Sequence, residues 1–215
     1  LKGQPVSRGN FFLFFTQWER FRKYLFAILI GLPIWYVAGI LFNLSNRFAQ
    51  DLFGSTTVDS GKATMIGYAA TFAGDILIGL VSQWFRSRKK ALYLFYGITF
   101  LSLLAYFSPF NDRDSRMYLI CGALGFGCGF WALFVTMGAE QFGTNLRATA
   151  ATTIPNMVRG LLPVINLVFI NLFQHQLQWT VVQSGFVTGL LVITISVLAA
   201  AFTPETFSKD LNYLE

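Results

Sequence analysis

The chain carries little charge for its length. Only 12% of its 215 residues are Asp, Glu, Lys or Arg, whereas soluble globular domains contain about twice that share. Hydrophobic residues make up 54% of the sequence and aromatic residues 17%. A composition this apolar excludes an ordinary soluble domain and indicates a protein that lies in a lipid bilayer.

Residues that could form a catalytic or metal-binding site are also scarce. Cys121 and Cys128 lie inside one apolar stretch and fit small packing residues, and the single histidine, His175, lies in a polar turn where a solvated ring is expected. No metal site and no cofactor are expected. An intramembrane serine protease needs a G-x-S-G context and a base within reach, but residues 182–185, VQSG, lack the first glycine and have no later histidine. The sequence therefore does not predict an enzyme.

Long apolar stretches occupy most of the chain. A helix needs ~20 mostly apolar residues to cross a bilayer, whereas a membrane β-strand needs only ~9–11. The stretches have the helical length and do not alternate in polarity, so the sequence predicts an all-α membrane protein with six transmembrane helices. The expected spans are 24–45, 63–85, 91–108, 117–138, 150–173 and 182–203.

The positive charges are distributed unevenly between the two sides. If the N-terminus is cytoplasmic, twelve cations belong to the inner side and four to the outer side, which is the bias of the positive-inside rule. Both termini are therefore expected in the cytoplasm, and the net charge of +6 reflects topology rather than nucleic-acid binding. The inner set is Lys2, Arg8, Arg20, Arg22, Lys23, Arg86, Arg88, Lys89, Lys90, Arg147, Arg159 (itself within the membrane) and Lys209; the outer set is Arg47, Lys62, Arg113 and Arg116.

The segment before the first span has a different character. Residues 10–23, NFFLFFTQWERFRK, mix aromatic and basic residues too closely for a spanning helix. Such a mixture is typical of a helix that lies along a membrane surface. We therefore expect this segment at the inner interface, ahead of the first span.

Small and polar residues recur at helical spacing within three spans. In the fourth, Gly122, Gly125 and Gly129 would let a neighbouring backbone approach closely. The second and fifth spans each carry a stripe that is too polar to face lipid. The two stripes are Gly67, Thr71, Asp75, Gly79 and Ser82, and Asn156, Arg159, Pro163 and Asn166.

Three stretches resemble motifs of the major facilitator superfamily (MFS) of transporters. Residues 79–90, GLVSQWFRSRKK, resemble the loop motif G-x-x-x-D-[RK]-x-G-R-[RK], with Gln83 at the aspartate position. Residues 140–147, EQFGTNLR, resemble E-x-F-P-T-x-x-R, with Gly143 where proline is common. Residues 204–210, PETFSKD, resemble the P-E-T-x-G-K/R ending. In this order, the motifs are similar to those of the C-terminal half of the superfamily.

The resemblance implies a six-helix half built as an inverted 3+3 repeat. Residues 1–23 would belong to the cytoplasmic linker between the halves, and 24–215 would form the membrane domain. The missing partner would be an N-terminal six-helix half, in the same gene product or as a second copy. The spans that face it would be the first, second, fourth and fifth, with the third and sixth outside.

The resemblance also implies a function. Members of the superfamily are secondary transporters that work by alternating access, so we expect a small-molecule substrate, coupling to protons and a place in the bacterial inner (plasma) membrane. The paired glutamines of sugar porters are absent from the first span, which disfavours a hexose and favours an amino acid or organic acid. A channel or a non-transporting receptor of the same fold is the alternative.

Opposite charges gather at the expected cytoplasmic ends of the helices. Glu140, Arg147 and Glu205 are expected to form ion pairs with the loop at 86–90 when the cytoplasmic side is closed. Partly exposed pairs contribute only ~0–1 kcal/mol each, so they would bias one conformation; a solvated loop is the alternative. The expected gate comprises Gly79, Arg86, Arg88, Lys89, Lys90, Glu140, Arg147 and Glu205.

Two charges are expected at a similar depth within the membrane. Asp75 lies about 15 Å from the inner end of its span, and Arg159 about 13 Å from the inner end of another. Because intramembrane ions are costly unless paired or hydrated, each is a functional candidate with the other as its partner. Arg159 would bind an anionic substrate group or balance Asp75, which would take up a proton; a fixed structural pair is the alternative. The other candidate substrate residues are Asn156, Asn166, Tyr36, Asn43 and Trp131.

Overall fold

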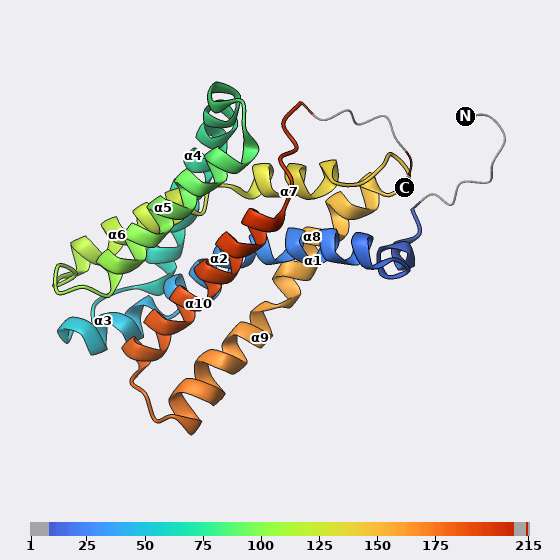
Figure 1. The fold of residues 1–215 in the computed structure, drawn as a ribbon. Helices are drawn as coiled ribbons and strands as arrows, with labels where there is room; N and C mark the ends of the chain where they lie inside the picture. The colour runs from blue at the N-terminus through green and yellow to red at the C-terminus, as the bar shows by residue number, and fades with distance from the viewer. Residues whose placement is uncertain (1–8, 209–213, 215) are drawn as a thin grey trace.

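The computed structural model describes residues 9–208 and 214, and all regular secondary structure among them is helical (Figure 1). The segments 1–8, 209–213 and 215, which include Lys2, Arg8 and Lys209, lie outside the described residues. The elements in chain order are η1 (Phe11–Phe15), α1 (Trp18–Ile30), α2 (Leu32–Tyr36), η2 (Val37–Phe42), α3 (Ser45–Phe53), α4 (Ser60–Phe85), α5 (Arg88–Tyr106), α6 (Asp114–Gly127), α7 (Trp131–Glu140), α8 (Arg147–Gly160), α9 (Leu162–Leu167), η3 (Val168–Gln176) and α10 (Val181–Phe202).

Within the described residues, five helical stretches are long and apolar enough to cross a membrane. They correspond to the first, second, fourth, fifth and sixth expected spans and confirm an all-helical chain that fits a multi-pass membrane protein. The third expected span falls in α5, whose first turn is Arg88, Lys89 and Lys90. Because of these three cations, the apolar part of α5 is shorter than the apolar part of each of the five stretches. The five stretches, numbered below by the expected spans to which they correspond, are the first (Trp18–Phe42), second (Ser60–Phe85), fourth (Asp114–Glu140), fifth (Arg147–Gln176) and sixth (Val181–Phe202).

The first of these stretches begins earlier than expected. Helix α1 starts at Trp18 rather than at 24, because the residues from Trp18 to Lys23 continue the helix instead of lying apart from it. Among residues 9–17, the separate element that precedes α1 is a short 3-10 helix, Phe11–Phe15. Phe12 and Trp18 are strongly exposed, as expected for side chains near a membrane surface.

Three of the stretches are interrupted. The first breaks at Gly31 and the fifth near Leu161, and in each case a proline, Pro33 or Pro163, sits in the first turn of the helix that follows. Proline lacks a backbone N–H and is tolerated at this position, where the N–H would have no helical partner. The fourth stretch breaks between α6 and α7, at 128–130.

Helices α4 and α6 pack backbone against backbone. A Cβ atom on Gly125 would lie 2.1 Å from the Gly67 carbonyl oxygen, and one on Gly129 would lie 2.5 Å from the Gly74 Cα. Either methyl group would clash with main-chain atoms, so these positions require glycine. A Cβ on Gly122 would meet only Ile66, at an ordinary 3.5 Å. The small-residue row in the fourth span thus serves close packing at two of its three positions.

The helices form two groups joined by a central pair. Figure 1 shows α4, α5 and α6 together on one side and α8 and α9 on the other, with α1 and α10 between them. The first stretch is 72% buried, whereas the second is 17% and the fifth 22% buried. The second and fifth stretches therefore present their apolar faces outward.

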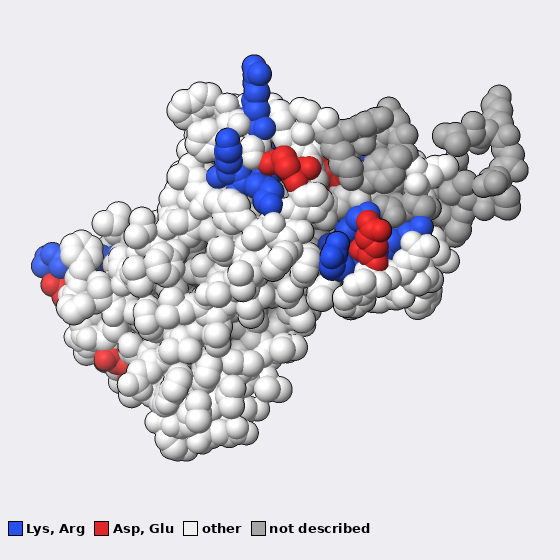
Figure 2. All heavy atoms as spheres, viewed as in Figure 1, with Lys and Arg blue, Asp and Glu red and all other residues white. Residues whose placement is uncertain are grey.

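Charged side chains gather at two ends of the molecule, with an uncharged belt between them on the face shown in Figure 2. We call the end that carries residues 86–90, 140–147 and 203–208 the basic end. Gly9, near the start of the described chain, donates to the Asn145 carbonyl there, at 3.0 Å. Gly9 and the segment 203–208, near the two ends of the described chain, therefore lie at the same end of the molecule.

Candidate functional site

The basic end joins the start of α5 to the segment that follows α10. The Glu205 carboxylate accepts hydrogen bonds from the Arg88 backbone N–H at 3.0 Å, the Lys89 backbone N–H at 3.2 Å and the Ser87 hydroxyl. The N–H groups in the first turn of a helix have no helical partner and attract anions. Burial alone would raise the pKa of Glu205, but these hydrogen bonds outweigh it and hold the pKa below its usual value.

A second contact joins the same two segments, with the charged side chain on α5 and the backbone acceptors at the end of α10. Lys89 Nζ donates to the Ala201 carbonyl at 3.0 Å and to the Thr203 carbonyl at 2.8 Å, at the C-terminal end of α10. A cation is favourable there, because the last carbonyls of a helix carry partial negative charge. The free N–H groups at the start of α5 and the free carbonyl groups at the end of α10 thus each receive a hydrogen-bond partner from the other segment.

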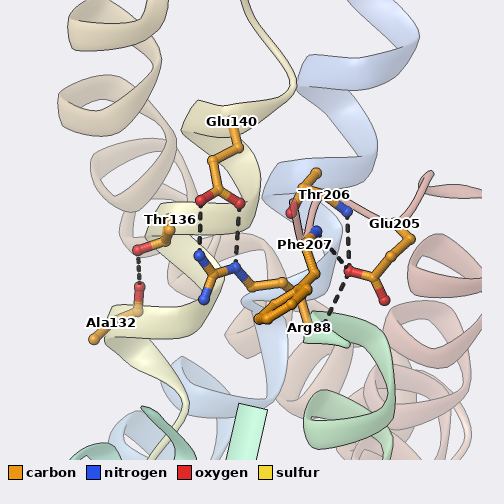
Figure 3. Close-up of polar contacts among 7 residues, drawn as sticks. All are labelled: Arg88, Ala132, Thr136, Glu140, Glu205, Thr206 and Phe207. Carbon is orange, nitrogen blue, oxygen red and sulfur yellow. Dashed lines mark hydrogen bonds and ion pairs between the residues drawn. The ribbon is translucent and has the colours of Figure 1, made fainter. Parts of the chain in front are cut away.

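Arg88 forms an ion pair in this cluster. Its guanidinium donates to both Glu140 oxygens, with Nε to Oε2 at 3.2 Å and Nη2 to Oε1 at 2.8 Å (Figure 3). The side chains are only 19% and 12% exposed. Arg88 also lies against the Phe207 ring, with Cζ 5.8 Å from the ring centre. One residue of the basic loop therefore links α5, α7 and the segment after α10.

The remaining expected gate residues take other places. Glu205 bonds to backbone N–H groups and a hydroxyl rather than forming an ion pair with the loop, which corrects that part of the expectation: the start of a helix offers better-aligned donors than flexible lysine side chains. Arg86 is exposed in a left-handed conformation (φ 49°) at the end of α4, and Gly79 and Lys90 are exposed. Arg147 donates to the Phe142 carbonyl at 3.2 Å.

A second candidate site lies away from the ends of the helices. A cavity of about 350 Å³ opens between the first stretch, α4 and α7. Its lining is mostly aromatic and aliphatic, with Asp75 as its one charged member. The lining residues are Ile34, Trp35, Ala38, Tyr68, Thr71, Phe72, Asp75 and Trp131.

Asp75 forms a hydrogen bond with the first turn of α7. Its Oδ1 accepts the Ala132 backbone N–H at 3.1 Å. The break at 128–130 leaves the first N–H groups of α7 without helical partners, and Phe130, the residue at the helix cap, has no side-chain acceptor. Asp75 therefore caps a neighbouring helix across the α4–α7 contact, which accounts for an acid in an apolar span.

Arg159 lies over one of the cavity's aromatic rings. Its Cζ is 5.3 Å from the centre of a Trp35 ring, a cation–π distance. Trp35 in turn meets Trp131 edge to face, with ring centres 6.0 Å apart. Asp75 and Arg159, both within the described residues, form no ion pair, so the expected direct partnership is wrong for this conformation. Trp35, which contacts Arg159, and Trp131 line the same cavity as Asp75.

The other candidate substrate residues lie outside the cavity lining. Tyr36 is fully buried and donates its hydroxyl to the Gly185 carbonyl of α10 at 2.6 Å, a packing contact. Asn43 is exposed and bonds the Gly39 carbonyl at 3.4 Å, and Asn156 is exposed and bonds Thr152 at 2.8 Å. Asn166 is partly buried in α9. Of the expected substrate residues, Asp75 and Trp131 line the cavity and Arg159 adjoins it.

The sequence reasoning missed Trp35, which contacts both Trp131 and Arg159. A usable signal was present: a tryptophan two residues after Pro33, in the middle of an apolar span rather than near its end, where tryptophans concentrate. Cys121 and Cys128 are buried free thiols, as expected. Among residues 9–208 and 214, no group of three or more His, Cys, Asp or Glu side chains could hold a metal ion.

Comparisons with known proteins give no match: the sequence matches no protein-family model, no curated protein and no solved structure.

Proposed function

We propose that this chain is the C-terminal half of an MFS-type secondary transporter for a small amino-acid-like metabolite. The observation that carries the proposal is the cavity between the first stretch, α4 and α7, with an acid in its lining and a guanidinium over its aromatic wall. Pockets for small ligands are mostly apolar with a few placed polar groups. Intramembrane charges at such a pocket are functional candidates by default.

The arrangement of charges favours a zwitterion. Asp75 can receive an ammonium group, and Arg159 can receive a carboxylate, while Trp35 and Trp131 in the cavity wall can pack against an apolar body. An organic acid would use Arg159 and leave Asp75 without a cationic partner. We therefore place amino acids ahead of organic acids among the substrates.

The outward faces support a missing partner. The exposed stripe of α4 is apolar and aromatic and repeats every three or four residues, and the fifth stretch is also mostly exposed. The cavity opens beside this stripe, so a second half would close it from the other side. In this proposal α5 completes the six spans, and the basic end faces the cytoplasm of a bacterial cell. The stripe is Met65, Tyr68, Phe72, Ile76, Leu80 and Trp84.

The interruptions of the helices also fit transport. Backbone that leaves the helical pattern within a membrane is tolerated where it lines a cavity or is buried in protein. Here the break before α7 is capped by the only acid of the cavity lining. Protonation of Asp75 would remove the charge from that contact and weaken it, which would couple a proton to the position of α7.

The test is uptake by proteoliposomes that contain the full-length protein. Radiolabelled amino acids are offered with and without an inward proton gradient. Accumulation above equilibrium that depends on the gradient supports a proton-coupled transporter. Rapid equilibration without accumulation would indicate a channel, and saturable binding without uptake would indicate a receptor.

A further inference from the structure

A polar hollow of about 400 Å³ lies at the basic end, apart from the cavity described above. It is enclosed by the start of α1, the start of α5 and the end of α10. We call it the basic hollow. Its polar lining includes Glu19, Arg22, Lys23, Lys89 and Gln141, and Ala201–Pro204 close it on the side of α10.

The charge of the basic hollow is positive. Three cations line it against one acid, Glu19, which is 71% exposed and pairs with Lys23 at 3.4 Å. Water therefore screens the charge of Glu19, whereas Lys23 is only 22% exposed. Lys89 donates to two carbonyls, but an ammonium group has three donors and keeps its charge. Arg22 is exposed at the rim. The hollow therefore suits an anion.

Aromatic side chains lie in and near the lining of the hollow: Phe26 and Phe202 belong to the lining, and Trp18 lies one helical turn before Arg22. Trp18 is 73% exposed and Phe202 is 70% exposed. Phe202 stacks on Phe26, with ring centres 5.9 Å apart. Exposed aromatic rings at the ends of spanning helices mark the boundary between lipid tails and headgroups. The hollow thus lies at headgroup level.

We propose that the basic hollow binds the phosphodiester headgroup of an anionic phospholipid. Basic pockets between spanning helices at this level bind such headgroups, and the acyl chains would lie along Phe202 and Trp18. A lipid fits better than the missing half of the protein, because two of the three helices that form the hollow, α5 and α10, belong to the third and sixth expected spans, which are expected to lie outside that interface. The faces left exposed for a partner half belong to α4 and to the fifth stretch.

The test measures lipid binding by the full chain in an uncharged detergent. Native mass spectrometry gives the apparent Kd of the first phosphatidylglycerol bound, with phosphatidylcholine as the neutral lipid and inorganic phosphate as a competitor. Wild type is expected to prefer phosphatidylglycerol, and millimolar phosphate should not displace it. Each cation removed should weaken binding about fivefold, so Arg22→Gln should raise the Kd about fivefold. Because Arg22 is exposed, this variant should remain folded.

Arg47→Gln is the matched control, since it removes an exposed arginine from the opposite end of the molecule and should leave the Kd unchanged. Lys23→Gln is a second variant that should act like Arg22→Gln. Equal affinity for the two lipids would overturn the proposal. So would unchanged binding in both hollow variants, or displacement of the lipid by phosphate, which would assign the hollow to a free anion.

Discussion

At the basic end, the charged groups of Glu140 and Glu205 are surrounded by donors, whereas Asp75 in the cavity receives one hydrogen bond from Ala132 and Arg159 rests on an aromatic ring. The first arrangement is saturated and holds three elements together. The second leaves charge facing a cavity. The difference indicates that the basic end stabilises one conformation, whereas the charges at the cavity remain available to a ligand that binds and dissociates.

The expected interaction energies also differ between the basic end and the cavity. Hydrogen bonds to a charged group contribute roughly 1.5–3 kcal/mol where the group is mostly buried, as in the pair of Arg88 and Glu140, and less at the partly exposed Glu205. A charged side chain at the centre of a membrane costs about 2.5–3.5 kcal/mol even on the lower scales. One hydrogen bond from Ala132 offsets only part of that cost for Asp75. Such a charge is retained where its function requires it.

The largest expected effect comes from removing the cavity charges. Asp75→Asn and Arg159→Gln should each reduce proton-driven uptake to the background of empty liposomes, because each removes one of the two groups that would hold a zwitterion. Asp51→Asn and Arg47→Gln, both exposed at the end opposite the basic end, are the matched controls and should transport normally. Wild-type uptake in both cavity variants would remove these residues from the mechanism.

The next effect tests the packing that positions Asp75. Gly125→Ala should lower the free energy of unfolding by about 3 kcal/mol or more, because its methyl group would meet the Gly67 carbonyl, which cannot rotate away. Gly122→Ala faces only Ile66 at an ordinary distance and should be nearly neutral. Thermal unfolding in detergent compares the two variants. Equal midpoints would show that the α4–α6 contact is looser than described.

A smaller effect is expected at the ion pair of the basic end. A double-mutant cycle of Arg88→Gln and Glu140→Gln should give a coupling energy of roughly 1.5–3 kcal/mol, because both side chains are mostly buried and share two hydrogen bonds. The cycle is measured by chemical unfolding of the four proteins. A coupling near zero would mean that water screens the pair as it screens surface pairs.

The smallest effect is a pH dependence at Glu205. Its pKa is lower in the folded chain than the ordinary value of 4.5, so the carboxylate stabilises the fold above about pH 4.5, and this contribution disappears as the pH falls through the lower folded-state pKa. The group is partly exposed, so Glu205→Gln should cost only about 1 kcal/mol or less at pH 7. Unfolding midpoints of wild type and variant should converge in acid. A constant difference at every pH would contradict this role.

Some of this structure follows directly from the sequence. The length of the apolar stretches predicts the helices, because a span must satisfy its backbone internally. The spacing of Gly125 and Gly129 predicts a close helix contact. Glu140 and Arg88 could be matched from charge alone, since both follow from motifs placed at one end of the spans.

Other features depend on information that residue counting lacks. Helical rise gives Asp75 and Arg159 a similar expected depth, but depth does not give the direction in which a side chain points, and two charges at one level can face different neighbours. The partner of Asp75 is a backbone N–H exposed by the break at 128–130, and the partners of Glu205 are N–H groups at the start of α5. Backbone donors of this kind cannot be identified from the residue types in a sequence.

The central claim is that Asp75 and Arg159 hold the two ends of one zwitterion across Trp35 and Trp131. Quenching of tryptophan fluorescence in the full-length protein can measure binding of the best-transported amino acid, of the amine that lacks its carboxylate and of the acid that lacks its ammonium group. The account predicts that the amino acid binds at least about tenfold more tightly than either derivative, a difference of about 1.4 kcal/mol. Equal affinity for the acid and the amino acid would contradict it, because Asp75 would then contribute nothing to recognition.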